Sequence, residues 1–156
     1  MISSITSLFV AVIVLLTNVV VPPSSTAFAI KCVGTAQFED NARGKVSKRH
    51  YDLPPQVYVF DPVSRRAELA LEPRQQFEPI CFKGGYLEEI DFSPGLIAVR
   101  SEAPGKLCDF RVSRRNGKGE YFSQEDLGAN LNSKIQYRLS CARSQIPQFD
   151  TNGNRF

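Results

Sequence analysis

Three carboxylates lie in one short stretch of the sequence: Glu88, Glu89 and Asp91. If this stretch is a strand, Glu89 and Asp91 share a face because side chains alternate along a strand. Two carboxylates in one site are the acid and base of a glycoside hydrolase, where they flank the scissile bond. No second acidic cluster stands out, so we interpret these carboxylates first as a solvated strand face. A hydrolase that uses Glu89 and Asp91 is our third functional hypothesis.

The sequence holds a single histidine, His50, within the basic segment 45–51. Serine and cysteine triads generally need a histidine base, and this one lies among other cations, which does not build a triad. We therefore expect His50 to be a surface side chain. One histidine and no C-x-x-C pair also predict no metal site and no cofactor. The sequence favours a protein that is not an enzyme.

Two groups of basic residues are candidates for anion binding. One lies in the segment Asp40–Pro55, which we predict to be an irregular loop, and the other lies around an expected hairpin turn at Asn116-Gly117. If the groups converge, they can hold a phosphate, a lipopolysaccharide head group or an acidic partner. The alternative is two ordinary charged hairpin ends. The candidate residues are Arg43, Lys45, Lys48 and Arg49 in the first group and Arg111, Arg114, Arg115 and Lys118 in the second.

The four cysteines, Cys32, Cys81, Cys108 and Cys141, are an even number, and no two are close in sequence. In an exported protein this pattern predicts two structural disulfides, which three connectivities allow. In a barrel or sandwich the first and last strands can lie side by side. We therefore predict the pairs Cys32–Cys141 and Cys81–Cys108.

Alternating apolar and polar residues dominate the chain after residue 29, and tight turns separate the alternating stretches. Clear examples are 30–39, 66–72, 108–113 and 134–141, and three of the four cysteines fall on apolar faces. The pattern predicts an all-β fold, an antiparallel meander of eight or nine short strands forming a small barrel or a sandwich.

Residues 1–29 contain no Lys, Arg, Asp or Glu and combine an apolar run with a closing Ala27-Phe28-Ala29. This small-x-small ending is typical of a cleavable signal peptide, so we expect cleavage after Ala29. The apolar run is short for a membrane span, although an uncleaved anchor is the alternative. The predicted organisation is a signal at 1–29, a β domain at 30–142 and a disordered tail at 143–156.

Several short motifs follow one another along the chain after the signal. They are Cys32–Thr35, Tyr58–Asp61, Ser93–Ile97, Arg114–Gly117, the last cysteine and the closing Arg155-Phe156. This layout resembles a group of uncharacterised, exported β-rich proteins of Gram-negative bacteria, a domain of unknown function. The resemblance covers most of the chain after the signal and implies no assigned activity. A more distant similarity is to periplasmic lysozyme-inhibitor β-barrels, whose Ser-Gly-rich inhibitory motif is absent here.

Together these features predict an exported, non-catalytic binding protein of the bacterial envelope, periplasmic or secreted. The expected partner is an anionic envelope component or another exported protein. The alternative is an inhibitor of a cell-wall-degrading enzyme. The net charge of +3 is too small to favour nucleic acid, and we expect no stable membrane insertion once the signal is removed.

Overall fold

The computed structural model describes residues 26–81, 86–128 and 131–149, and of residues 86–89 it describes the backbone alone. Over these residues the chain forms nine antiparallel strands in one sheet, in the order β4-β3-β2-β1-β9-β8-β7-β6-β5. The predicted all-β meander is confirmed. The strands are β1 (Phe28–Ala42), β2 (Lys45–Asp61), β3 (Arg66–Leu71), β4 (Gln76–Pro79), β5 (Tyr86–Asp91), β6 (Leu96–Ala103), β7 (Lys106–Ser113), β8 (Lys118–Gly128) and β9 (Leu131–Ser144), with a 3₁₀ helix η1 (Glu72–Arg74) between β3 and β4.

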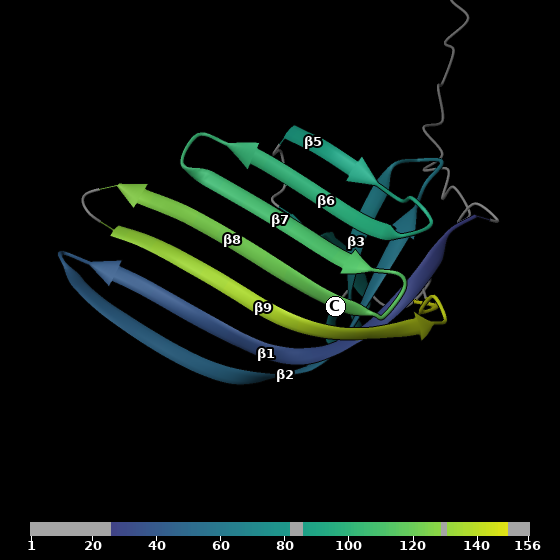
Figure 1. Ribbon diagram of the computed structural model, residues 1–156, viewed down its shortest axis with the longest axis horizontal. Helices are drawn as coiled ribbons and strands as arrows, with labels where there is room; N and C mark the ends of the chain where they lie inside the picture. Colours follow the sequence, from purple (N-terminus) through teal and green to yellow (C-terminus); the bar gives the residue numbers. More distant parts are fainter. Residues whose placement is uncertain (1–25, 82–85, 129–130, 150–156) are drawn as a thin grey trace, which may run out of the picture.

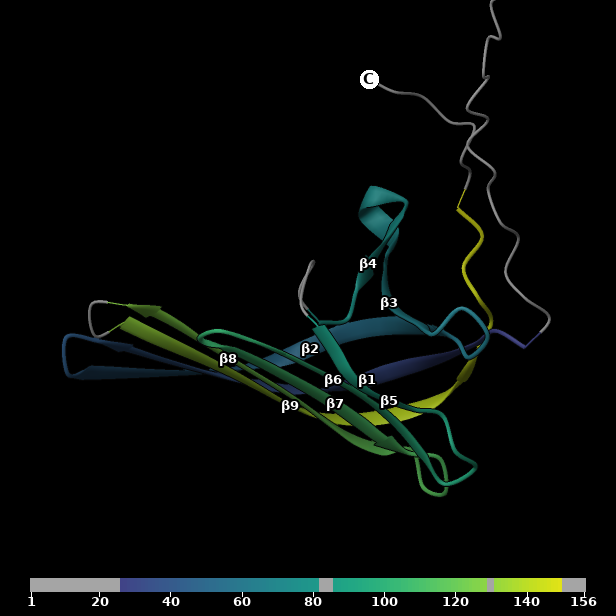
Figure 2. The same ribbon diagram turned by 90° about the horizontal axis from the view of Figure 1, so that it is seen from above.

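The sheet curls into a half-barrel, with β1 and β9 at its middle (Figure 1). The hairpin of β3 and β4 rises out of the plane of the longer strands (Figure 2). The predicted small barrel is thus present as a single sheet curled into a half-barrel (Figure 1). Three strands are also long, because β1, β2 and β9 have 15, 17 and 14 residues.

The inner face of the curl carries the main hydrophobic core. Successive side chains of a strand point to opposite faces, so the alternation read from the sequence supplies one apolar residue in two to this core. Aromatic rings fill its centre, where Tyr58 and Phe60 lie 4.8 Å and 6.0 Å from Phe110. The core consists of Ile30, Cys32, Tyr58, Phe60, Ala67, Ile80, Cys81, Ile97, Val99, Cys108, Phe110, Val112 and Leu139.

The two disulfides join Cys32 to Cys141 and Cys81 to Cys108, as predicted. Cys32 and Cys141 face each other directly in the ladder between β1 and β9. Cys81 follows β4 at one edge of the sheet, whereas Cys108 lies in β7 near the other edge. The first bridge therefore locks the middle of the sheet, and the second holds the curl together across its inner face.

The predicted loop Asp40–Pro55 is instead part of a long hairpin between β1 and β2. Its turn is Arg43-Gly44, and both residues have positive φ, which is the requirement of a tight two-residue hairpin. Two prolines opposite Val33 form a bulge in β2, where a strand tolerates residues without an N–H donor. Residues 40–55 lack apolar alternation because this end of the hairpin extends beyond the main core.

The predicted disorder of the tail 143–156 does not describe its first part. Strand β9 continues to Ser144, and Ile146 and Phe149 then pack on a second apolar cluster of Ala29, Val57, Val59 and Ala70. This segment runs beside the β3–β4 hairpin (Figure 2), where the rings of Phe77 and Phe149 lie 4.7 Å apart. Residues 150–156 lie outside the described part of the chain.

Removing the disulfides is expected to destabilise the protein in proportion to the loops that they close. In the chain-entropy model, C32A/C141A, which opens a separation of 109 residues, lowers the free energy of unfolding by about 5 kcal/mol. The pair C81A/C108A, with a separation of 27, lowers it by about 3.5 kcal/mol. Equilibrium urea unfolding measures both. A larger loss for C81A/C108A would contradict the loop-length account.

The buried phenols are expected to make the fold sensitive to alkaline pH. Burial raises the pKa of Tyr58, Tyr121 and Tyr137 above the ordinary value of 10.0. Above pH 10 the unfolded chain releases these protons while the folded chain keeps them, so the free energy of unfolding falls as pH rises. The ultraviolet difference between wild type and Y58F isolates the phenolate of Tyr58. A midpoint in the folded protein equal to that in urea would contradict the prediction.

Candidate functional site

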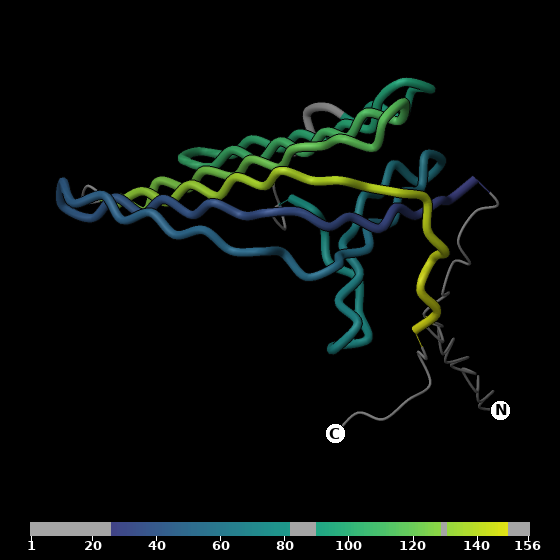
Figure 3. Tube along the Cα trace, turned by 60° about the horizontal axis from the view of Figure 1, so that its bottom comes forward, coloured from purple at the N-terminus to yellow at the C-terminus, as the bar shows by residue number. Residues whose placement is uncertain are grey.

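A cleft lies at the end of the sheet where β1 begins and β9 ends. In Figure 3 these strands meet beside the turn between β7 and β8. The cleft encloses about 520 Å³, which is in the range of small-molecule sites. Its lining residues are Thr26, Ala27, Phe28, Ile30, Ile97, Val112, Ser113, Arg114, Gly117, Cys141, Ala142 and Arg143.

The floor of the cleft is apolar and continuous with the main core. Phe28, in the first position of β1, stacks on the buried Phe60 with ring centroids 5.3 Å apart. It also contacts the edge of Phe92, which follows β5, at 6.1 Å. Ile97 and Val112, paired across β6 and β7, are each 2% exposed. A ligand in the cleft would therefore meet the half-buried ring of Phe28, with Ile97 and Val112 buried beneath the surface.

Arg114 is held in place on one side of this floor. Its Nη1 donates to the carbonyl oxygens of Ser93 at 3.1 Å and Phe92 at 3.5 Å. Its guanidinium carbon lies 5.0 Å from the centre of the Phe28 ring, which gives a cation–π contact. A guanidinium has five N–H donors, so these contacts orient Arg114 without using all of its hydrogen-bonding capacity.

The turn that carries Arg114 is fixed to the disulfide-bonded strand. The amide of Cys141 donates to the carbonyl of Gly117 at 2.8 Å, and the amide of Gly117 donates to Ser113 at 2.9 Å. Gly117 has a φ of +68°, and a Cβ on it would overlap the carbonyl oxygen of Cys141. The site therefore requires glycine here, both for its conformation and for the close approach of the two strands.

Arg143 supplies a second cation to the cleft from the end of β9. It pairs with Ile30 in the ladder, two residues beyond Cys141, and so lies on the inner face of the sheet. No aspartate or glutamate is among the residues that line the cleft. Two arginines over an apolar floor can bind an anionic group attached to an apolar body.

The first predicted basic group lies at the opposite end of the sheet and does not join this site. Arg43 and Lys45 flank the β1–β2 turn, at the left of Figure 1, whereas the β7–β8 turn lies at the right. Lys48 bonds to Glu39 at 2.9 Å, and this hydrogen bond lowers the pKa of the Glu39 carboxyl. The two groups therefore do not converge, and they lie at separate ends of the sheet, as in the alternative of two charged hairpin ends.

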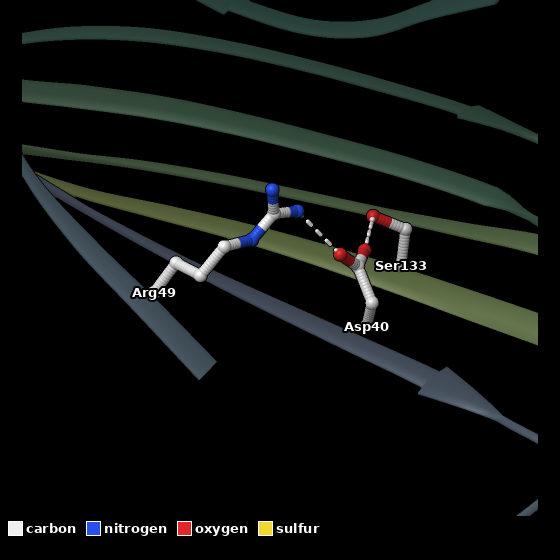
Figure 4. Close-up of polar contacts among 3 residues, drawn as sticks. All are labelled: Asp40, Arg49 and Ser133. Carbon is white, nitrogen blue, oxygen red and sulfur yellow. Dashed lines mark hydrogen bonds and ion pairs between the residues drawn. The ribbon is translucent and has the colours of Figure 1, made fainter. Parts of the chain in front are cut away.

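Arg49, the fourth member of the first group, is engaged in a polar contact of its own. It pairs with Asp40 at 2.6 Å, and Asp40 also accepts a hydrogen bond from Ser133 at 3.0 Å (Figure 4). The hydrogen bond to Asp40 raises the pKa of the guanidinium. These contacts tie β1 to both of its neighbouring strands and leave Arg49 paired with a carboxylate.

The second predicted group is only partly in the site. Arg114 lines the cleft, whereas Arg111 pairs with Asp109 at 2.8 Å on the outer face. Arg115 and Lys118 are exposed beside the turn and do not line the cleft. Arg143 was missed because it was assigned to a disordered tail. The continued alternation from Leu139 through Cys141 to Arg143 was the signal that could have found it.

The other candidate residues are not among those that line the cleft. Oδ1 of Asp91 accepts a hydrogen bond from the amide of Ser93 at 2.7 Å and so stabilises a turn. Glu89 pairs with Arg100 in the backbone ladder, and its side chain is outside the described part of the structure. His50 is exposed in β2. Nothing in the described structure joins these groups into one site.

Within the described residues, no three His, Cys, Asp or Glu side chains gather as a metal site. The same part of the chain has no helix with the length and hydropathy of a membrane span. Comparisons with protein-family models, curated proteins and solved structures find no match. The resemblances inferred from the sequence therefore stay predictions, and the site must be interpreted from its own geometry.

Replacing Gly117 is expected to lower the free energy of unfolding by more than its backbone conformation alone accounts for, because of its close contact with Cys141. Gly44 has a similar φ of +80° and open space around it, so G44A should cost about 1 kcal/mol for conformation only. G117A adds the overlap with Cys141 and should cost about 3 kcal/mol. Urea unfolding of both variants measures the difference. Equal losses would show that the close approach contributes nothing.

Proposed function

We propose that the protein is an exported, non-catalytic binding protein of the bacterial envelope, and that its cleft binds an anionic amphiphile. The ligand class is a single acyl chain with a phosphate or carboxylate head group. The observation that carries this proposal is the apolar floor of Phe28, Ile97 and Val112 beneath Arg114 and Arg143, with no acidic residue in the lining.

The apolar floor suits the acyl chain because it removes hydrocarbon from water. Each buried methylene contributes about 0.8 kcal/mol, and a volume of about 520 Å³ holds a chain of moderate length. Arg114 and Arg143 suit the head group because guanidinium forms bidentate hydrogen bonds to phosphate and carboxylate. Tail and head would thus be recognised by different parts of one cleft.

The lining supports binding over catalysis. It offers two hydroxyls, on Thr26 and Ser113, but no His, Asp, Glu or Lys that could act as a general base beside them. Its cysteine, Cys141, is held in a disulfide and has no thiol to offer as a nucleophile. The two disulfides support export, since such bonds persist in oxidising compartments.

Calorimetric titration with dodecyl phosphate below its micelle concentration tests the proposal. Dodecyl maltoside and dodecyltrimethylammonium have the same tail with a neutral and a cationic head, and both should bind at least tenfold more weakly, about 1.4 kcal/mol. R114Q and R143Q should each lower the affinity for dodecyl phosphate by about tenfold, because each loses a charge-assisted hydrogen bond. Raising the ionic strength should also lower the affinity of the wild-type protein for dodecyl phosphate.

R138Q is the matched control. It removes one charge from the same strand, β9, but Arg138 pairs with Thr35 and Glu120 on the outer face, away from the cleft. It should leave the affinity within about twofold, because exposed charges interact weakly across such distances. Equal losses in R138Q and R143Q, or equal binding of the three head groups, would refute the cleft as an anion site.

A further inference from the structure

The sheet begins earlier than the predicted cleavage site allows. Strand β1 starts at Phe28, and Ala29 pairs with Val59 on one side and Ser144 on the other. Ala29 is 1% exposed, within the second apolar cluster. Cleavage after Ala29 would therefore remove Phe28 and Ala29, the first two residues of β1, from the sheet.

A chain that began at Ile30 would also lose part of the cleft. Phe28 forms the floor on which the acyl chain would lie, and its ring is the surface over which Arg114 is held. It stacks on Phe60 and contacts Phe92, so its loss would expose the end of the core. The contacts of Phe28 therefore argue against cleavage after Ala29, although the sequence pattern allows it.

The sequence offers a second bond with the same small-x-small pattern. Ser25-Thr26-Ala27 places small residues one and three positions before the bond between Ala27 and Phe28. We propose, on the basis of the proposed export, that a leader peptidase cleaves this bond. Water is consumed, Ala27 leaves with a new carboxylate, and Phe28 becomes the N-terminal residue with a free α-amine. The mature protein then keeps every residue of β1.

This cleavage completes the binding site. Thr26 and Ala27 line the cleft in the uncleaved chain, so their removal enlarges the opening. Since Ala27 and Phe28 both lie on its wall, the new α-amine also lies there. An α-amine is largely protonated at neutral pH, so the rim gains a third cation beside Arg114 and Arg143. The precursor would accordingly bind an anionic amphiphile less well than the mature chain.

The test is to express the full chain with its own leader in a Gram-negative host and to determine the N-terminus of the exported product. Intact mass after reduction, with α-amine labelling, distinguishes the starts. A product that begins with Phe28 is expected. A product that begins with Ile30 overturns the inference and leaves export standing. A product that keeps the leader overturns the inference and removes the support for export by a cleavable signal.

Two serine variants in the leader test the position independently of folding, because both residues are absent from the proposed mature protein. S25L places a large side chain three positions before the Ala27–Phe28 bond and should reduce processing at least tenfold. S24L makes the same change one position earlier and should process normally to Phe28. If S25L is processed as efficiently as S24L, cleavage does not depend on Ser25 and the proposed site is wrong.

Discussion

The pairing of the first strand with the last joins the two halves of the sheet. Strands β2, β3 and β4 extend from β1, whereas β8, β7, β6 and β5 extend from β9. Among the described strands, the β1–β9 ladder is the hydrogen-bonded connection between these halves, and the Cys32–Cys141 bridge adds a covalent link within it. Gly34 sits two residues along β1, where a Cβ would overlap the carbonyl of Arg138. Close contact between β1 and β9 is thus built into the residue types.

The candidate site is a consequence of that pairing. The beginning of β1 and the end of β9 must lie side by side, so Phe28 and Arg143 arrive at the same end of the sheet. The β7–β8 turn brings Arg114 to this end and is fixed there through Gly117. Residues more than a hundred positions apart thus form one wall, and no local sequence pattern brings them together.

The parts of the fold that could be predicted are those with a strong local signal. Alternation identified the strands, and the expectation that the first and last strands lie side by side identified the pairing of the cysteines. The relation between the basic groups could not be predicted without strand order. Since β7 runs antiparallel to β1, the turn after β7 lies at the end where β1 begins, away from the turn at Arg43.

One error came from judging a short segment at the end of the domain by its composition. Residues 143–149 were assigned to a disordered tail because alternation fades there. The segment depends on a distant partner, since the ring of Phe149 packs on that of Phe77. Contacts between distant residues are invisible to a local pattern.

The central position of β1 and β9 also governs when the protein can fold. Ala29 and Ser144 are partners, so the sheet cannot close until nearly the whole chain has been made. Such distant pairings slow folding, because the conformational entropy of a large loop is lost before the stabilising contacts form. Until β9 arrives, one edge of β1 has no partner strand. The β1–β9 ladder and the Cys32–Cys141 bridge therefore form only after β9, the last strand, has been synthesised.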